Sequence, residues 1–386
     1  MAKGAGMRMR QSKRGQVEAF IVMDVMEAAR RAEAEGRHII HMEVGQPATG
    51  APAAARAALQ ARLDRPLGYT VALGLPELRA GIAALYDRWY GVDLDPTRVV
   101  VTAGASGAFT LAFAALFDAG DRVAMGDPGY PSYRQILRAM SLSPVAIPTL
   151  PEHRYQPCPQ EIPADVQGLM LASPGNPSGT MLGPQAFRTL LDRAAELGVS
   201  VISDEIYHGL SYGERCHSAL EFSDDVYVVN SFSKYFSMTG WRIGWMVVPE
   251  AHIRTVERLA QNMFICPPHA SQIAALGALD AMEECEGFRA VYAENRRRLM
   301  DALPKIGFDR IAPPDGAFYV YADVSAMTDD SLRFCGEILE RAGVAVTPGL
   351  DFDPMRGRRT IRLSYAGSTD DIAEGIARLS SFMASR

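Results

Sequence analysis

The stretch of sequence that decides the fold is SFSKYFSMTGWRIG, residues Ser231–Gly244. Its one lysine, Lys234, has the hydroxyls of Ser231 and Ser233 beside it, and Arg242 follows eight residues later. Two hydroxyls and a guanidinium are suited to holding a phosphate, and a desolvated lysine can form a Schiff base with an aldehyde. A lysine in a loop is more often an ordinary surface residue, so it is the neighbours of Lys234 that favour a functional site.

Short apolar runs alternate with helical patterns through the middle of the chain, which is typical of βαβ units and a mainly parallel sheet. Several runs are apolar almost throughout, as expected for strands that helices cover on both faces. Pro184–Leu197 has the spacing of an amphipathic helix, with proline in its first turn and Gly198 at its end. The sequence therefore predicts an α/β fold. Its seven predicted strands are Arg98–Thr102, Arg122–Met125, Val145–Pro148, Gly168–Ser173, Val199–Asp204, Val226–Ser231 and Ile243–Val248.

The pattern changes after about residue 285, where a long polar helix containing NRRR begins. Three short strand candidates follow it, Ala317–Asp323, Val344–Thr347 and Thr360–Tyr365, and they favour a separate α+β domain. A helix candidate near the N-terminus, Val17–Glu35, is expected to pack with them. Because 386 residues are too many for one ordinary domain, we expect a large domain of residues 48–285. The small domain would combine an N-terminal segment, residues 1–47, with residues 286–386.

Composition narrows the class of protein. The formal charge of 39 − 45 = −6 provides no field that would attract nucleic acid. The five cysteines are scattered and form no CxxC pair, so we expect reduced thiols in a cytoplasm and no metal site. No apolar run reaches the roughly 20 residues that span a bilayer. The basic N-terminus, MAKGAGMRMRQSKRG, lacks the apolar region of a secretory signal. We interpret it as a solvated leader, with a nucleic-acid arm or a transit sequence as alternatives.

The segment Ser231–Gly244 resembles the lysine-attachment signature of the class I/II aminotransferases, the fold-type-I family that includes aspartate aminotransferase. It matches at the serine, the lysine, two glycines and the arginine, and the resemblance extends in the same order over nearly the whole chain. It implies pyridoxal 5'-phosphate held by Lys234 as a Schiff base, the internal aldimine. In that arrangement Ser231, Ser233 and Arg242 lie at the phosphate of the cofactor.

Two further motifs follow predicted strands, at the sheet edge where ligands of open parallel sheets bind. In SDEIY, Asp204 alone would be interpreted as a helix cap. The resemblance implies that it pairs with the protonated pyridine nitrogen, which keeps the ring able to withdraw electrons. It also implies that Tyr207, and Asn176 of ASPGNPSGT, donate hydrogen bonds to the ring phenolate oxygen.

VTAGASGAF and DPGYPSY are weaker signals. The first is a strand, a glycine-rich turn and a helix start, which by itself also fits a degenerate dinucleotide-binding turn. By resemblance, Ala105 and Ser106 lend amides to the phosphate. In the second motif a tyrosine between glycine and proline is more often turn packing, but by resemblance Tyr130 stacks on the pyridine ring.

Three outlying residues complete the site that the resemblance implies. Arg362 of RLSYA binds the substrate α-carboxylate, with Gly45 of EVGQP and Asn176 beside it. Tyr69 of GYTVALGLPELR reaches the phosphate of a neighbouring subunit, so the active sites of a homodimer are shared.

The function expected is an aminotransferase that moves an amino group from an L-amino acid to a 2-oxo acid, with Lys234, Asp204 and Tyr207 as catalytic residues. One alternative is a pyridoxal-phosphate lyase, of the β C–S lyase or cyclopropane-carboxylate-synthase type, which shares every cofactor residue. A non-enzymatic regulatory protein on the same fold is more remote, because the residues before EVGQP leave no room for a complete DNA-binding domain. An oxidoreductase that uses GASGAF for a nucleotide accounts for neither Lys234 nor Asp204.

The donor is not fixed by these motifs. Aspartate-preferring relatives of one subgroup have an arginine just before a Pro-Pro pair, whereas this chain reads LAQNMFICPP, with Gln261 in that neighbourhood. Met263, Phe264 and Ile265 are packing residues or line the side-chain pocket. If they line it, an apolar or aromatic donor is favoured, because a carboxylate facing them would be desolvated without a partner.

Overall fold

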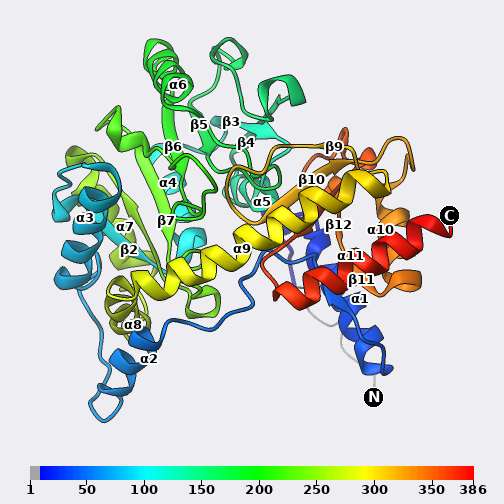
Figure 1. The fold of residues 1–386 in the computed structure, drawn as a ribbon. Helices are drawn as coiled ribbons and strands as arrows, with labels where there is room; N and C mark the ends of the chain where they lie inside the picture. Colours follow the sequence, from blue (N-terminus) through cyan, green and yellow to red (C-terminus); the bar gives the residue numbers. More distant parts are fainter. Residues whose placement is uncertain (1–8) are drawn as a thin grey trace, which may run out of the picture.

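The computed structural model describes residues 9–386. Its main element is a seven-stranded sheet of order β2-β8-β7-β6-β5-β3-β4, with helices packed on it (Figure 1). All seven predicted strands are confirmed, with ends that differ by two residues at most. They are β2 Val99–Thr102, β3 Arg122–Asp127, β4 Ser143–Pro148, β5 Gly168–Ala172, β6 Ser200–Asp204, β7 Tyr227–Ser231 and β8 Gly244–Val247.

The direction of the strands places the site. Strands β3 to β7 pair in parallel, and β8 alone is reversed, because it pairs antiparallel with both β7 and β2. The sheet is therefore mainly parallel, as predicted. The carboxyl ends of β2, β5, β6 and β7 consequently lie along one edge, where an open α/β sheet binds its ligands.

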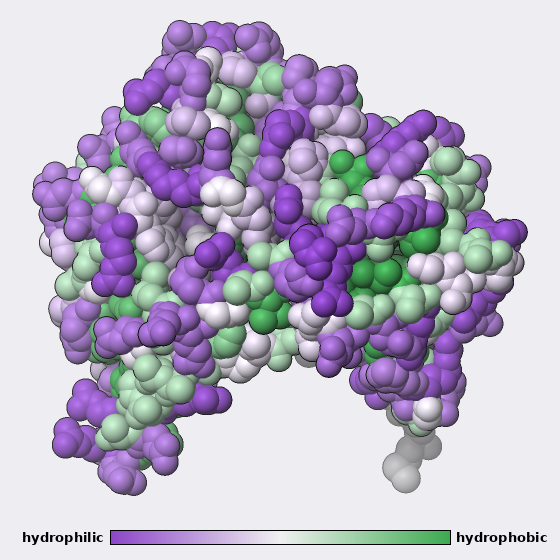
Figure 2. Space-filling model, in the orientation of Figure 1, coloured by the Kyte–Doolittle hydropathy of each residue, from purple (hydrophilic) through white to green (hydrophobic). Residues whose placement is uncertain are grey.

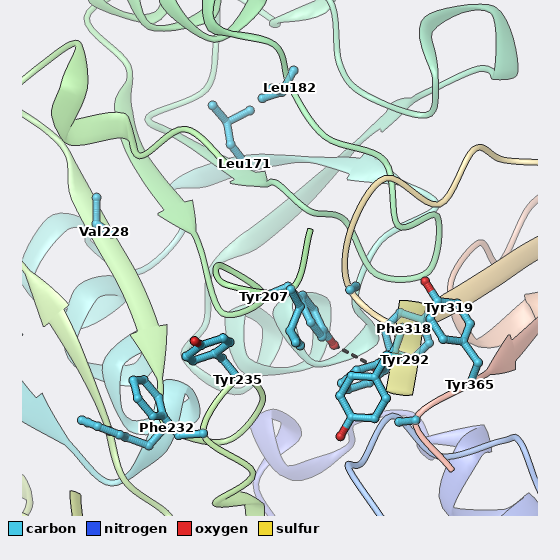
Figure 3. Packing of buried hydrophobic residues seen from close by; sticks show 14 of the residues in the cluster. Leu171, Leu182, Tyr207, Val228, Phe232, Tyr235, Tyr292, Phe318, Tyr319 and Tyr365 are labelled. Carbon is cyan, nitrogen blue, oxygen red and sulfur yellow. Dashed lines mark hydrogen bonds between the residues drawn. The ribbon is translucent and has the colours of Figure 1, made fainter. Parts of the chain in front are cut away.

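Alternation along the strands explains why both faces of the sheet are covered. In β5, Leu169 and Leu171 belong to one buried apolar cluster, and Met170 belongs to another on the opposite face. The second cluster includes Phe109 and Phe113 of helix α4. Figure 3 shows the first cluster continuing from Val228 of β7 to Phe318 near the C-terminal sheet.

Eleven α-helices lie within the described residues. The predicted helix α6 begins and ends at the predicted residues, with Gly198 in the left-handed conformation at its end. The helices are α1 Ile21–Ala34, α2 Ala53–Gln60, α3 Pro76–Tyr90, α4 Gly104–Leu116, α5 Pro131–Ala139, α6 Pro184–Leu197, α7 Ile253–Met263, α8 His269–Leu279, α9 Met282–Ala302, α10 Ser331–Ala342 and α11 Thr369–Ala384.

A second, smaller group of strands follows the long helix α9, with α10 and α11 packed beside it (Figure 1). Its four-stranded antiparallel sheet has the order β12-β13-β10-β9, and β1 pairs in parallel with β11. The β1–β11 pair joins the N-terminal segment to the C-terminal third of the chain. The strands are β1 Ile40–His41, β9 Arg310–Ile311, β10 Tyr319–Asp323, β11 Val344–Ala345, β12 Thr347–Pro348 and β13 Thr360–Ser364.

Two elements differ from the sequence prediction. The single strand expected at Val344–Thr347 is two short strands that join different sheets, β11 with β1 and β12 with β13. The N-terminal helix begins at Ile21, later than predicted, because the carboxylate of Asp351 accepts hydrogen bonds from the amides of Ile21 and Val22. Both differences come from contacts between segments that are far apart in the chain.

The described residues were compared with the features of membrane proteins and of metal-binding proteins. None of the helices in residues 9–386 has the length and apolar character needed to cross a membrane. Over the same residues no cluster of histidine, cysteine and acidic side chains suits a metal ion. The five cysteines are all unpaired. Figure 2 shows one face of the molecule as mostly hydrophilic, with hydrophobic side chains in smaller groups. Residues 1–8 of the basic leader lie outside the described part.

Candidate active site

A cavity of about 620 Å³ lies at the carboxyl edge of the large sheet, and Arg362 of β13 also lines it. Its lining residues come from many separate parts of the chain, from Phe20 to Arg362. Such a cavity has the size of a cofactor or small-molecule site. The residues predicted from sequence that line it are Gly45, Ala105, Ser106, Tyr130, Asn176, Asp204, Tyr207, Ser233, Lys234, Arg242 and Arg362. Ser231 and Tyr69 are predicted site residues that do not line it.

Lys234 lies just after β7, and its Nζ donates a hydrogen bond of 2.6 Å to the carbonyl oxygen of Gly45. Burial, together with the cations Arg362 and Arg242, lowers the pKa of Lys234 to about 8, while Asp204 opposes this shift. A lowered pKa gives a larger fraction of neutral amine at neutral pH, and the neutral amine is the form that attacks a carbonyl.

Asp204 ends strand β6 and is buried. Its carboxylate accepts a short hydrogen bond from the hydroxyl of Tyr133 and one of 3.1 Å from the amide of Ile206. Burial raises the pKa of Asp204 to about 6, although these hydrogen bonds and Lys234 lower it. Within residues 9–386 this buried carboxylate faces the cavity and has no salt bridge, which suits a cationic ring N–H, so this end of the cavity fits a pyridinium.

Tyr133 is a site residue that the sequence analysis missed. It lines the cavity together with Tyr130, and both belong to the start of α5, Tyr130 as the residue before its first turn. The two rings meet edge to face with centroids 5.3 Å apart. Its place three residues after Tyr130 in the motif DPGYPSY was the available signal.

Tyr207 and Tyr319 bring two hydroxyls together. They share a hydrogen bond of 2.7 Å, and both side chains line the cavity (Figure 3). A Cβ atom at Gly45 would lie 1.8 Å from the hydroxyl of Tyr319, so only glycine permits this approach of the EVGQP loop. Tyr319 belongs to β10 and no local motif marks it in the sequence.

The first turn of α4 and the guanidinium of Arg242 form a further part of the cavity wall, here called the phosphate end. Gly104 has φ +72°, and a Cβ there would lie 2.6 Å from Nη2 of Arg242, so the guanidinium lies directly against the helix start. Ala105 and Ser106 follow in the same turn. Free amides of a helix N-terminus and a guanidinium are donors that bind a phosphate.

Two serines adjoin this end of the cavity in different ways. Ser233 lines it, whereas Ser231 lies behind, with its Oγ 2.8 Å from Oγ of Ser233. Ser231 also donates a hydrogen bond of 2.9 Å to the carbonyl oxygen of Ile243. Ser231 therefore orients Ser233 and does not face the cavity itself.

Arg362 is only 3% exposed, and its guanidinium carbon lies 4.3 Å from the ring centroid of Tyr319 and 4.6 Å from that of Phe352. Nη1 donates to Oδ1 of Asn176 at 2.8 Å, and Nη2 donates to the carbonyl oxygen of Glu43. Nε has no hydrogen-bond partner among the described residues, although it is buried. Because buried donors are nearly always paired, this one is suited to a carboxylate ligand.

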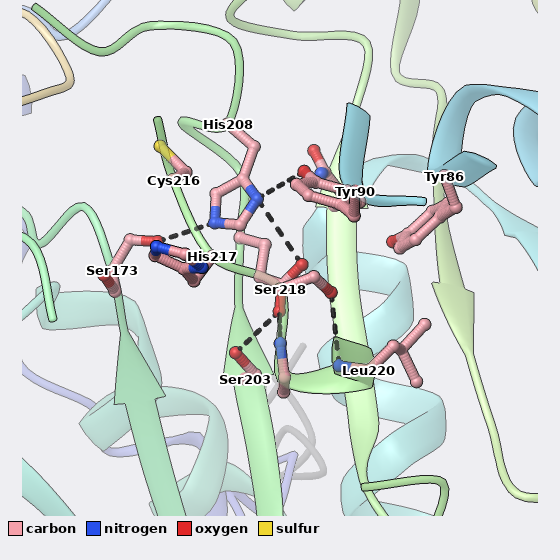
Figure 4. Close-up of polar contacts among 12 residues, drawn as sticks. Tyr86, Tyr90, Ser173, Ser203, His208, Cys216, His217, Ser218 and Leu220 are labelled. Carbon is pink, nitrogen blue, oxygen red and sulfur yellow. Dashed lines mark hydrogen bonds and ion pairs between the residues drawn. The ribbon is translucent and has the colours of Figure 1, made fainter. Parts of the chain in front are cut away.

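A buried histidine, His208, contacts Ser173, three residues before Asn176, and Figure 4 shows this contact. Nε2 of His208 donates to the carbonyl oxygen of Ser173 at 2.8 Å, and its Nδ1 accepts from the hydroxyl of Tyr90 at 2.5 Å. Burial lowers the pKa of His208 to about 3, so the ring is neutral and the carbonyl fixes its tautomer. His208 follows Tyr207 directly, and sequence analysis gave it no role.

Tyr69 lies outside the cavity and is 82% exposed. Val71 close by is also exposed, and so are Met263, Phe264 and Ile265. The two segments adjoin, because the amide of Thr70 donates to Sγ of Cys266 and Nδ1 of His269 lies 3.0 Å from the carbonyl oxygen of Gly68. Gln261 and Met263–Ile265 therefore do not line the cavity of their own chain.

The mainly parallel sheet, together with an amine, a buried carboxylate and guanidinium groups in one cavity, is typical of the fold-type-I enzymes that use pyridoxal phosphate. Comparison with known proteins gives the same answer. Residues 37–379 match the family "Aminotransferase class I and II". The chain belongs to this family, whose members are enzymes that depend on pyridoxal phosphate and move amino groups from amino acids to 2-oxo acids.

Individual relatives cover nearly the whole chain. It is 48% identical over 381 residues to a valine–pyruvate aminotransferase of Mycobacterium tuberculosis, covering 97% of this chain and 98% of that one. A solved structure from Silicibacter pomeroyi is 62% identical, with a TM-score of 0.94, and the match covers 98% of this chain and 100% of that one. An aspartate aminotransferase of Pyrococcus horikoshii is 32% identical, covering 88% of this chain and 90% of its own.

Proposed function

We propose that this cavity binds pyridoxal phosphate and that Lys234 is the amine that attaches it. The observation that supports the proposal is the cavity itself, which contains the amine of Lys234, the buried carboxylate of Asp204 and the unpaired Nε of Arg362. The cofactor would supply an aldehyde for the amine and an aromatic ring that withdraws electrons from the substrate Cα.

The remaining lining residues would orient the ring. Asp204 would hold the proton at the ring nitrogen, and Tyr207 and Asn176 would donate to the phenolate oxygen. Oδ1 of Asn176 already accepts from Arg362, so its amide nitrogen is the group that donates. Tyr130 stacks on the ring.

The phosphate end is a set of donors. It would be bound by the amides of Ala105 and Ser106, the hydroxyl of Ser233 and the guanidinium of Arg242, with Ser231 behind.

The substrate would be held by its α-carboxylate. Arg362 supplies the paired donors, with Gly45 and Asn176 beside it. With the cofactor bound, the amine of Lys234 is the group that would take the proton from the substrate Cα as a base and give it back as an acid. A lysine with a pKa near 8 suits both steps, because acid–base catalysis works best near the operating pH.

A half-reaction distinguishes transamination from lyase chemistry. The enzyme with its cofactor is mixed with an amino donor in the absence of any 2-oxo acid. We expect one oxo acid per subunit, after which the reaction stops until a 2-oxo acid is added. Continued release of ammonia without an acceptor would show a lyase and contradict the proposal.

We also propose a specific pair of substrates. The similarity to a valine–pyruvate aminotransferase supports valine as donor and pyruvate as acceptor for this chain. Measured rates with valine and pyruvate are therefore the first assay to attempt.

We propose that the enzyme is a homodimer with shared sites. The support is the exposed apolar surface on the two adjoining segments, because large exposed apolar areas mark interfaces. Its members include Leu67, Tyr69, Val71, Met263, Phe264 and Ile265. In this dimer Tyr69 reaches the phosphate site of the partner.

Complementation tests the shared site. Lys234→Ala and Tyr69→Ala subunits are each expected to be inactive or strongly impaired. Mixed dimers regain one complete site, because the intact Lys234 and the intact Tyr69 then meet across the interface. An equal mixture should recover about a quarter of wild-type activity, since about half of the dimers are mixed and one of their two sites works. No recovery after confirmed subunit exchange, or an active monomer, would contradict the dimer proposal.

We also propose the division into a large domain of residues 48–285 and a small domain of residues 1–47 and 286–386. Pairing of β1 with β11 supports it, although position 285 falls in the first turn of α9. A cytoplasmic location is likewise our proposal, supported by the unpaired cysteines.

A further inference from the structure

We propose that residues 16–23, here called the strap, form the wall that selects the side chain of the amino donor, and that they restrict donors to apolar side chains. The inference rests on the proposed function, because it takes Arg362 as the α-carboxylate site. The strap contributes Phe20, Val22 and Met23 to the lining of the cavity.

One end of the strap is fixed to the sheet that contains Arg362. The amides of Ile21 and Val22 donate to the carboxylate of Asp351 at 3.0 and 3.1 Å. Asp351 is 6% exposed and ends the turn that follows β12, and Thr347 of β12 pairs directly with Arg362. The wall and the carboxylate site are therefore attached to the same sheet.

The other end of the strap is fixed to α5. The amide of Glu18 donates to Gln135 at 3.2 Å, and its carboxylate accepts from Gln135 at 3.1 Å and from Arg138 at 2.8 Å. These contacts are exposed, so they position the strap and add little stability. Helix α5 directly follows Tyr130, so this end is attached beside the proposed ring-stacking residue.

Three apolar side chains of the strap line the cavity, Phe20 between the two attachments and Val22 and Met23 at its C-terminal end. The ring of Phe20 meets the ring of Tyr130 edge to face, with centroids 6.0 Å apart. Val22 is 5% exposed, and Met23 is 46% exposed at the rim. Val44 and Phe109 add further apolar lining.

Charge decides which donors this wall admits. Within the described residues, the cations that line the cavity are Lys234, Arg242 and Arg362, and each already has a role in the proposed function. A donor side chain that ends in a carboxylate would lose its hydration against the strap and find no unassigned cation among the described residues of its own subunit. An apolar side chain gains from the same wall, where each methylene is worth ~10- to 200-fold in kcat/KM.

The test measures kcat/KM for alanine, valine, leucine and aspartate with pyruvate as the fixed acceptor. Wild-type enzyme is expected to prefer valine or leucine to aspartate by at least ~100-fold, within the range of hydrophobic-pocket discrimination. Phe20→Ala should lower the rate with leucine by about tenfold more than the rate with alanine. Met23→Arg should raise the ratio of kcat/KM for aspartate to kcat/KM for valine by at least tenfold, because the arginine adds a cation to the wall. Met23 lies at the rim, so this variant should fold.

Met355→Arg is the matched control. Met355 is 85% exposed and does not line the cavity, so the order of donors should be unchanged. Arg362→Lys should instead lower the rates with all donors by a similar factor, because it contacts the carboxylate that they share. A wild-type preference for aspartate, or strap variants that keep the wild-type order of donors, would overturn the role of the strap while transamination itself stands. Absence of reaction with any donor, together with absence of cofactor attachment to Lys234, would overturn the proposed function and this inference together.

Discussion

Replacing Lys234 with alanine is expected to abolish measurable transamination, lowering kcat by at least ~10²–10⁴-fold, the range for removal of a general acid–base group. The loss should exceed that of an ordinary acid–base residue, because the same amine attaches the cofactor. Cofactor binding should survive in part, since Arg242 and the start of α4 still hold the phosphate. The measurements are kcat with valine and pyruvate, and the absorption spectrum of the bound cofactor.

Chemical labelling identifies the lysine directly. The chain has only four lysines, Lys3, Lys13, Lys234 and Lys305. Borohydride treatment of the yellow holoenzyme should fix the cofactor on the peptide that contains Lys234. Lys305→Ala is the matched control, because Lys305 is exposed and should neither be labelled nor affect turnover. Label on any other lysine would show that the assignment of Lys234 is wrong.

The sequence predicted the large sheet well because its strands are buried on both faces. In the predicted strand Gly168–Ser173 the residues from Leu169 to Ala172 are all apolar, and Pro174 ends the run. The small strands were less accessible to prediction. Val344–Thr347 looks like one strand locally, but the chain changes partner within it, from β1 to β13. Only the tertiary partner reveals that change.

In the candidate site, too, the residues that depend on tertiary contacts could not be predicted from the local sequence. Motif residues such as Lys234 and Asp204 follow predicted strands, so their position at a common sheet edge could be inferred from the sequence alone. Tyr319 could not be inferred, because its contact with Tyr207 joins residues 112 positions apart. The strap was missed for a similar reason: Phe20 belongs to a segment without a motif, and Asp351, which fixes that segment, is 330 residues from Ile21. Phe264 was left open as a packing residue or a pocket residue, and it does not line the cavity of its own chain.

The carboxylate of Asp204 is expected to be needed for turnover and to lower the stability of the folded protein. The loss of stability should depend on pH, which allows it to be measured separately from turnover. The pKa of Asp204 is raised from 3.8 to about 6 by burial, so the folded protein without cofactor favours the protonated form. Stability from this group is therefore present in full below about pH 4 and is lost as pH rises through 6. Asparagine cannot ionise, and its side-chain oxygen can still accept from the hydroxyl of Tyr133.

We therefore expect Asp204→Asn without cofactor to be more stable than wild type by about 3 kcal/mol at pH 8, and equally stable near pH 4. Its kcat should nevertheless fall by at least ~10²-fold, as when one preorganised electrostatic partner is removed, because no charge then holds the proton on the ring nitrogen. Adding the cofactor should reduce or reverse the stability difference, since a ligand stabilises most the protein that binds it most tightly.

Denaturant unfolding at pH 4, 6 and 8, with and without cofactor, measures the change in stability, and kcat with valine and pyruvate measures the change in turnover. A variant that keeps wild-type turnover would remove Asp204 from the mechanism. Equal stability at pH 8 would show instead that the carboxylate is already ionised at little cost, so that Tyr133 and the amide of Ile206 are sufficient partners for its charge.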